Sequence, residues 1–366
     1  MAGLSPDEKL RYQRQIQIPE VGPEGQARLK EARVLVVGAG GLGCPLSLYL
    51  AAAGVGTIGL VDFDAVDLTN LQRQVLYSTE SVGRPKLSEA RARLSALNPH
   101  VRLECHDTRL SADNALELVR GYDVVADGSD NFPTRYLVND AAVLAGKPNV
   151  FGSVFRFEGQ VAVFWARRGP CYRCLYPEPP PPEAAPSCAQ AGVFGLLPGI
   201  VGCLQAAETL KLLLGIGSPL VGRLVHFDAL SMEWRSLAVA KDPACRLCGP
   251  KADIRAPVAT DSRCAPSEEP PEVEPDELRA RLERCEAVLV IDVREPRERE
   301  LGVIEGSVSI PLGQLAQRAA GLPRDRDIVL HCQSGRRSAR AVELLRERGF
   351  TRVAHLAGGL DAWKAI

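Results

Sequence analysis

The sequence predicts an α/β protein with two domains, and three observations lead to this prediction. Short apolar segments typical of strands alternate with segments typical of helices in both parts of the chain, a pattern that favours parallel sheets. The stretch from Gly249 to Pro275 is rich in proline, charged and small residues and lacks apolar periodicity, as a linker does. A length of 366 residues fits about two to three domains. We therefore expect one domain over residues 1–248, a linker over 249–275 and a small second domain over 276–366.

Composition and charge exclude some classes of partner. The chain has 44 Lys and Arg against 45 Asp and Glu, so its net charge of −1 favours neither nucleic acid nor anionic membrane. The first twenty residues are polar and lack a signal-peptide core, and the longest uncharged apolar run, 191–204, is too short to cross a bilayer. We expect a cytoplasmic protein. Its 11 cysteines, an odd number, should then be metal ligands, catalytic groups or core residues.

The first domain should begin with a helix and continue as alternating strands and helices. Ser5 and Glu8 can form a capping box, with Pro6 at the first helical position. Strands are expected at 32–38, 57–62 and 123–130, and a helix at about 44–53. The proline-rich stretch 178–187 can form neither a strand nor a helix, so it is either a mobile loop over a site or a plain linker.

A glycine-rich turn follows the first of these strands. Gly38, Gly40 and Gly43 form G-x-G-x-x-G at the start of a helix, where a tight turn and the helix N-terminus favour phosphate. Asp62 ends the next strand, where a carboxylate can bind ribose hydroxyls. This motif fits NAD, FAD or ATP, and a dehydrogenase is the first hypothesis that it suggests.

Charged residues beyond Asp62 favour ATP instead. Arg73 and Lys86 supply two cations, which suit a triphosphate whose charge must be neutralised while pyrophosphate leaves. Asp130 follows the strand at 123–130, at the sheet edge where ligands bind, and a carboxylate there can hold Mg²⁺.

Two C-x-x-C pairs predict a metal site. Two such pairs can give tetrahedral thiolate coordination of Zn²⁺ in a closed structural site, with no position left for water. The alternative is two redox pairs or disulfides, which a reducing compartment disfavours. The four predicted ligands are Cys171, Cys174, Cys245 and Cys248.

The second domain carries a candidate nucleophile. Strands are expected at 288–292 and 327–332 and an amphipathic helix at 338–349. Cys332 lies between the second strand and this helix, in a loop of backbone amides that should stabilise a thiolate or a bound persulfide anion. The alternative is an inert buried cysteine.

Residues 4–250 resemble the E1-like superfamily of the molybdopterin-synthase adenylyltransferase and ThiF type. The matching stretches are RYQRQ at 11–15, GAGGLGCP at 38–45, NLQRQ at 70–74, GRPK at 83–86, SDN at 129–131 and FRFEGQ at 155–160. Members of this family adenylate the C-terminal glycine of a small ubiquitin-fold sulfur carrier.

The resemblance also implies roles for individual residues. The family pattern assigns ATP and Mg²⁺ to Gly41, Asp62, Asn70, Arg73, Lys86, Asp130 and Asn131. Arg14 would reach the phosphates of the other subunit of a homodimer, and the four cysteines of the C-x-x-C pairs would hold a structural zinc. Cys188, at the end of the proline-rich stretch, would be the acyl-accepting cysteine or a non-catalytic loop thiol.

Residues 276–366 resemble the rhodanese homology domain. The matches are IDVREPRE at 291–298, IEGSVSIPL at 304–312, the C-x-x-G-x-R-S loop from Cys332 to Ser338, and HLAGGLDAW at 355–363. The five residues between Cys332 and Ser338 are the loop length of a sulfurtransferase. Gly302 and Val303 depart from the Gly-His of many rhodaneses, a position that does not carry sulfur.

The two resemblances imply an α/β fold: a Rossmann-like E1-type adenylation domain with a zinc site, then a small α/β rhodanese domain. The implied enzyme adenylates a carrier protein ending in Gly-Gly and transfers sulfur from a thiosulfate or persulfide donor through Cys332, giving a thiocarboxylate. One alternative is a dinucleotide-dependent oxidoreductase with a regulatory rhodanese, which leaves Arg73, Lys86 and the C-x-x-C pairs without a purpose. The other is a non-catalytic scaffold, which Asp130 and Cys332 argue against.

Overall fold

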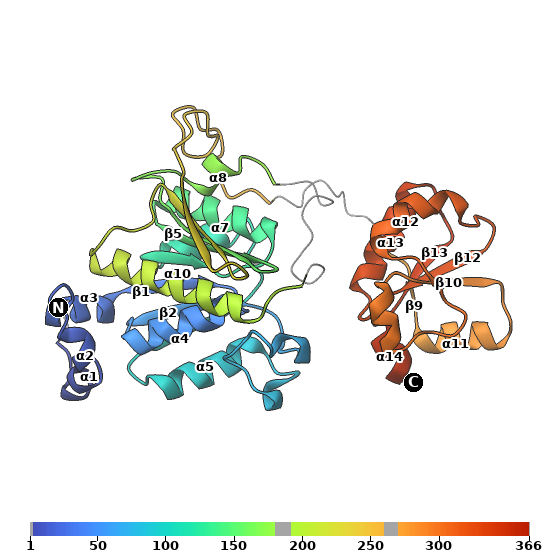
Figure 1. Ribbon diagram of the computed structural model, residues 1–366, viewed down its shortest axis with the longest axis horizontal. Helices are drawn as coiled ribbons and strands as arrows, with labels where there is room; N and C mark the ends of the chain where they lie inside the picture. The colour runs from blue at the N-terminus through green and yellow to red at the C-terminus, as the bar shows by residue number, and fades with distance from the viewer. Residues whose placement is uncertain (1–2, 180–191, 260–269, 366) are drawn as a thin grey trace. The chain divides into compact units, whose positions relative to one another are not determined.

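A computed structural model describes residues 3–179, 192–259 and 270–365 of the chain (Figure 1). The chain divides into two compact units, Met1–Arg263 and Cys264–Ile366. Each unit has its own sheet and its own buried core.

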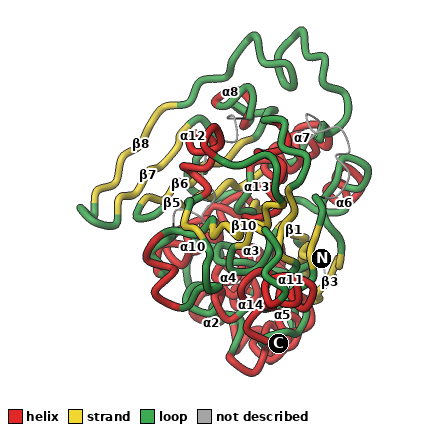
Figure 2. The backbone as a smooth tube through the Cα atoms, turned by 90° about the vertical axis from the view of Figure 1, so that its right-hand side faces the viewer, coloured by secondary structure: helices red, strands yellow, loops and turns green. Residues whose placement is uncertain are grey.

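The first unit is built on an eight-stranded sheet in the order β3-β2-β1-β4-β5-β6-β7-β8. The strands from β3 to β5 are parallel, and those from β5 to β8 pair in antiparallel fashion toward the edge strand β8 (Figure 2). Their bounds are β1 Arg33–Val37, β2 Thr57–Asp62, β3 Arg102–Asp107, β4 Val124–Asp127, β5 Asn149–Phe155, β6 Glu158–Phe164, β7 Arg223–Asp228 and β8 Glu233–Ala238.

Helices cover both faces of the parallel part of this sheet (Figure 1). Along β1 the apolar residues alternate: Val34 and Val36 belong to the core under α4, α5 and α10, whereas Leu35 and Val37 belong to the core under α6 and α7. A parallel strand covered on both faces is apolar throughout, as β1 is. The helices of this unit are α1 Pro6–Arg11, α2 Gln13–Ile16, α3 Gly22–Glu31, α4 Gly43–Ala53, α5 Lys86–Leu97, α6 Ala115–Arg120, α7 Phe132–Ala145, α8 Tyr172–Leu175 and α10 Leu196–Leu214.

Helix α10 is long and apolar enough, by length and composition alone, to cross a membrane. It is nevertheless a core helix, because it packs against α4, β5 and β6. Its buried Gln205 donates through Nε2 to the carbonyl oxygens of Asp127 (2.7 Å) and Val150 (3.0 Å), which ties the helix to β4 and β5. The helix begins later than the apolar run 191–204 and continues through Glu208 and Lys211.

The second unit has a five-stranded parallel sheet in the order β11-β10-β12-β13-β9. Helix α13 packs on β12 and β13, and α14 packs on β13 and α11. The elements are β9 Glu272–Val273, α11 Pro275–Glu283, β10 Val288–Asp292, β11 Val308–Ser309, α12 Leu312–Arg318, β12 Asp327–His331, α13 Arg336–Glu347, β13 Val353–Leu356 and α14 Gly359–Ala365. Short 3₁₀ helices complete the two units: η1 Leu68–Asn70, η2 Thr79–Ser81, η4 Pro296–Leu301 and η5 Ala319–Gly321.

The predicted fold class is confirmed, and several predicted elements lie where the sequence placed them. The strand 57–62 is β2 and the strand 288–292 is β10, residue for residue, and the capping box of Ser5 and Glu8 starts α1. The stretch 249–275 overlaps both units: Ile254 is buried in the first, and β9 belongs to the sheet of the second. Most of the proline-rich stretch 178–187 lies outside the described residues, and so does Cys188.

Candidate active site and metal centre

A cavity of about 330 Å³ opens at the carboxyl ends of β1, β2 and β4. The loops after β1, β2, β3 and β4 form most of its wall, to which α7 and the residues Val154, Val193 and Pro198 also contribute. Ligands of open α/β sheets bind at this edge. Six residues that were predicted to bind nucleotide line it: Gly41, Asp62, Arg73, Lys86, Asp130 and Asn131.

The glycine-rich turn is shaped by two of its three glycines. Gly38 has φ +91°, and a Cβ there would lie 2.9 Å from the carbonyl oxygen of Gly128. A Cβ on Gly43 would lie 1.8 Å from the carbonyl oxygen of Gly38, so only glycine fits. The third, Gly40, has ordinary space around it, 3.7 Å from Gln74 Nε2. The turn lets the backbone approach phosphate at the start of α4.

The carboxylates of Asp62 and Asp64 set the charge at the back of the cavity. Asp62 accepts from the backbone N–H groups of Ala39 (2.8 Å), Phe63 (2.8 Å) and Asp64 (2.9 Å), which fixes its carboxylate against the glycine-rich turn. Lys86 Nζ lies 3.0 Å from Asp64 Oδ2 and 3.9 Å from Asp62 Oδ1. The buried ammonium of Lys86 therefore has its charge balanced by Asp64, a partner that the sequence did not indicate.

Asp130 and Asn131 stand where β4 passes into α7. Asn131 caps the helix by accepting the N–H of Thr134 (2.9 Å), and Asp130 is exposed at the cavity. The buried Asp127 supports this turn, since its Oδ1 accepts from the N–H (3.0 Å) and hydroxyl (2.6 Å) of Ser129. Burial raises the pKa of the Asp127 carboxyl. The carboxylate of Asp130, exposed at this cavity, is the kind of oxygen ligand that Mg²⁺ prefers.

The lining also contains residues with long polar or charged side chains that the sequence analysis did not assign to the site. They are Asp64, Gln74, Arg109 and Arg135. Arg135 is buried between the rings of Phe132 and Phe151, at 5.3 and 5.4 Å from their centroids. Helical spacing in the sequence could have indicated Arg135. It lies four residues after the cap Asn131, and so on the same face of α7, which turns to the cavity.

Two predicted nucleotide residues are not part of this lining. Asn70 ends η1, where its Oδ1 accepts the N–H of Asp67 (3.3 Å). Arg14 is exposed on α2, between two residues that anchor the segment. Tyr12 is buried and its hydroxyl accepts from Asn98 (2.8 Å), and Gln15 donates to Gln26 (2.7 Å).

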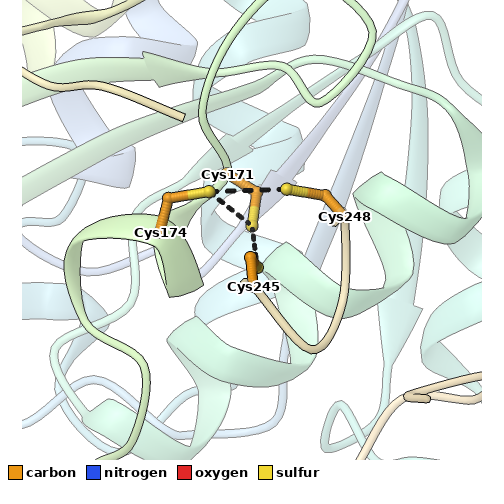
Figure 3. Close-up of side chains that lie close together, drawn as sticks. All are labelled: Cys171, Cys174, Cys245 and Cys248. Carbon is orange, nitrogen blue, oxygen red and sulfur yellow. Dashed lines mark hydrogen bonds between the residues drawn. The ribbon is translucent and has the colours of Figure 1, made fainter. Parts of the chain in front are cut away.

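The four predicted metal ligands come together as one cluster (Figure 3). Cys171 is the N-cap of α8 and Cys174 lies within it, whereas Cys245 and Cys248 belong to the loop after β8. The Sγ atoms all lie within 4.8 Å of one another, with separations of 3.8, 3.6 and 3.4 Å for three of the pairs. Four thiolates about 2.3 Å from a zinc ion would lie about 3.8 Å apart, so the cluster fits a tetrahedral Cys₄ site.

The cluster is tied to helix α7 through Arg173, which lies between two of its cysteines. The buried Arg173 donates to both carboxylate oxygens of Asp140, at 2.7 and 2.8 Å, and its guanidinium lies 4.7 Å from the ring centroid of Tyr136. Asn139 adds a third link by accepting the N–H of Tyr172 (2.8 Å). Helix α7 therefore carries Asp130 and Asn131 beside its first turn and the metal cluster along its second half.

Cys174→Ala is expected to release the metal and to lower the free energy of unfolding by about 3 kcal/mol or more, because metal binding is coupled to folding. Metal analysis and thermal unfolding measure the two effects. Cys203→Ala is the matched control, since Cys203 lies on α10, away from the cluster. Wild-type protein that contains no stoichiometric zinc would overturn the assignment.

Cys332 is buried at the end of β12, directly before α13. The hydroxyl of Ser338 donates to the carbonyl of Gly335 (2.9 Å) and lies 3.6 Å from Cys332 Sγ. The N–H groups of Gln333, Ser334 and Gly335 donate to no backbone carbonyl in the parts of the chain that the structure describes. They remain available to an anionic sulfur at the helix N-terminus.

Arg337, beside this loop, forms an ion pair with Glu298. Its NH1 and NH2 donate to the two carboxylate oxygens of Glu298, at 2.7 and 2.6 Å. The Arg337 guanidinium keeps the pKa of Glu298 below its usual value. The loop thus presents backbone amides and a charge-balanced ion pair to the sulfur.

Both parts of the chain match known protein families. A model of the ThiF family matches residues 12–247, and a model of the rhodanese-like domain matches residues 274–366. The probable adenylyltransferase/sulfurtransferase MoeZ of Mycobacterium tuberculosis is 47% identical over 378 residues, which cover 99% of this chain and 94% of the relative. Adenylyltransferase and sulfurtransferase MOCS3 of Mus musculus is 42% identical over 399 residues, covering 100% of this chain and 87% of the relative.

Other relatives match the first unit. The sulfur carrier protein adenylyltransferase of Thermus thermophilus is 59% identical over 259 residues, covering 69% of this chain and 96% of the relative. The crystal structure of E. coli MccB with MccA-N7isoASN superposes with a TM-score of 0.60 at 23% identity, covering 67% of this chain and 75% of that chain, and shows the shared fold. The chain belongs to the ThiF family, as an adenylyltransferase joined to a rhodanese-like sulfurtransferase domain.

Proposed function

We propose that this enzyme adenylates the C-terminal glycine of a small ubiquitin-fold sulfur carrier that ends in Gly-Gly, and then gives that carrier sulfur through Cys332. The observation that carries the proposal is one cavity that joins a glycine-rich turn, the cations Arg73 and Lys86, and the carboxylate of Asp130. The Thermus relative is named a sulfur carrier protein adenylyltransferase, which supports the choice of substrate.

In the adenylation step the protein mainly stabilises charge and forms no covalent bond to the reactants. A carrier carboxylate oxygen attacks the α-phosphorus of ATP, and pyrophosphate leaves from the other side. Arg73 and Lys86 would offset the charge on the phosphates, and Lys86 would exchange part of its pairing with Asp64 for them. Asp130 would hold Mg²⁺, which supplies further positive charge to the leaving group. Asp62 would bind the ribose and Asn131 would complete the site, whereas Asn70 is not part of the cavity lining.

The sulfur step uses the loop of Cys332. A thiosulfate or persulfide donor would load sulfane sulfur onto the thiolate, and the terminal sulfur would then attack the carrier acyl-adenylate with loss of AMP. The resulting link between carrier and Cys332 contains an S–S bond, which a thiol must cleave to free the thiocarboxylate. Cys188 is the candidate for that thiol or for an earlier acyl acceptor.

Pyrophosphate exchange with each Gly-Gly carrier of the host tests the proposal. We expect ATP–pyrophosphate exchange that depends on one such carrier and on its terminal glycine. An oxidoreductase would instead change absorbance at the nicotinamide band, and a scaffold would turn over no ATP with any carrier. Either of these results would contradict the proposal. We propose separately that the enzyme is cytoplasmic.

We propose further that the enzyme is a homodimer in which Arg14 completes the ATP site of the other subunit. Tyr12 and Gln15 anchor α2 to its own subunit and leave Arg14 exposed, as a residue that serves a neighbour requires. Chains with Arg14→Ala and chains with Asp130→Ala should each be inactive in exchange.

Mixing the two variants should restore about a quarter of the wild-type activity, because random pairing gives half hybrids with one intact site each. Sedimentation of each variant alone checks that it still dimerises. A mixture that stays inactive, or a wild-type monomer, would count against the dimer.

A further inference from the structure

Arg294 donates hydrogen bonds to several residues near the Cys332 loop, and the proposed mechanism gives it no role. It is the largest fully buried side chain in the described parts of the protein. All five N–H donors of a guanidinium find acceptors here. Two go to the carboxylate of Asp292 (3.0 and 2.8 Å), one to the side chain of Gln333 (2.9 Å), and two to the carbonyls of Glu298 (3.3 Å) and Gly302 (2.7 Å).

Gln333 follows Cys332 directly, and its side chain is held from two sides. Arg294 donates to its Oε1, and its Nε2 donates to Oδ1 of Asp361 on the first turn of α14. The backbone repeats this contact, since the N–H of Asp361 donates to the carbonyl of Gln333 (3.0 Å) and the N–H of Leu360 to the carbonyl of Cys332 (2.8 Å).

These contacts decide where the amides of the loop point. In a planar trans peptide the C=O and the following N–H point in opposite directions. Because the carbonyls of Cys332 and Gln333 are turned toward α14, the N–H groups of Gln333 and Ser334 are turned away from it, to the inside of the loop.

Gly359 makes this approach of α14 feasible. It has φ +64°, and a Cβ there would lie 2.7 Å from the carbonyl oxygens of both Cys332 and Gln333. A residue with a Cβ at this position would keep the backbone of α14 from coming close enough to the loop to form these hydrogen bonds.

We infer that Arg294 and Asp361 are positioning residues for the sulfur transfer. By holding Gln333 between them they turn the loop amides toward the Cys332 sulfur, where these amides stabilise the thiolate and the persulfide anion. The inference rests on the proposed role of Cys332. The reaction it serves moves the outer sulfur of thiosulfate to the thiolate, with sulfite leaving and the negative charge passing to the persulfide.

The test is the alkylation rate of Cys332 by iodoacetamide at two pH values, with the full-length enzyme. In Asp361→Ala and Gln333→Ala the rate at pH 7 should fall about tenfold, since misaligned amides no longer stabilise an anionic sulfur. At pH 10, where a thiol ionises without help, it should be unchanged. Asp361 is exposed, so its substitution leaves the core intact. The double variant should be no slower than Gln333→Ala alone, because the two residues act through one contact.

Arg294→Lys and Arg299→Lys form a matched pair. Both arginines bind Asp292, but the hydrogen bonds of Arg299 go to Asp292 (3.0 Å) and to the carbonyl of Ser307 (3.4 Å), whereas Arg294 also binds Gln333. Arg294→Lys should show the loss at pH 7, and Arg299→Lys should not. Equal losses at both pH values would reveal a purely structural role and overturn the inference, as would unchanged rates. Wild-type enzyme that takes no sulfur from thiosulfate onto Cys332 would instead contradict the proposed function.

Discussion

Cys332→Ala is expected to abolish thiocarboxylate formation and to leave pyrophosphate exchange unchanged. The thiolate is the sulfur carrier in the proposed reaction, so its loss should lower the sulfur-transfer rate by more than about 1000-fold, as removal of a nucleophile does. In the proposed reaction adenylation uses the cavity of the first unit, whose lining does not include Cys332. Mass spectrometry of the carrier measures the thiocarboxylate, and labelled pyrophosphate measures exchange.

Cys285→Ala is the control for Cys332→Ala, because Cys285 is an exposed cysteine of the same unit. It should keep both activities. Since Cys332 is buried, thermal unfolding of Cys332→Ala must also be recorded, to separate lost chemistry from lost packing. If Cys332→Ala made thiocarboxylate from thiosulfate at the normal rate, the rhodanese domain would not be the sulfur donor.

Asp130→Ala is expected to slow adenylation by about 100- to 1000-fold while ATP still binds. A carboxylate that holds Mg²⁺ stabilises charge that grows as pyrophosphate leaves, so its removal should affect the transition state more than the bound ground state. Pyrophosphate exchange gives the rate, and equilibrium binding of ATP gives the affinity. Nearly normal exchange would refute the metal-binding role.

Asp107→Ala is the control for Asp130→Ala. Asp107 also ends a strand of the parallel sheet, β3, but it is not part of the cavity lining. Its substitution should leave exchange unaffected, which would show that position at the cavity, and not the loss of a surface carboxylate as such, causes the effect.

Five of the parallel strands, β1, β2, β4, β10 and β12, could be predicted because their signals are local. β2 and β10 are short apolar runs ended by an aspartate, and α1 has its cap in the sequence. The antiparallel strands β6 to β8 were not predicted. All residues of β8 are exposed, so no buried apolar face marks it as a strand, and its position depends on pairing with β7. β9 has only two residues, and only its partner β13 makes it a strand.

The candidate sites show the same division between motifs and contacts. Glycines and cysteines with fixed spacing were found in the sequence, and the structure brings Cys171, Cys174, Cys245 and Cys248 together. The pairing of Lys86 with Asp64, and of Arg337 with Glu298, could not be found, because a charge in a loop does not specify its partner. Arg294 stands in a stretch that was matched to the rhodanese family, yet nothing in the spacing shows that it is fully buried.

The distance along the chain between the two halves of the metal centre has a consequence for synthesis. Seventy residues separate Cys174 from Cys245, and helix α10 lies between them. A domain emerging from the ribosome is made from its N-terminus onward. Asp130, Asn131 and the rest of α7 are therefore outside the ribosome long before the second cysteine pair can close the site. During this interval α7 has the contacts of Asn139 and Asp140 with the segment of the first cysteine pair, and a four-cysteine metal site can close only after residue 248 has emerged.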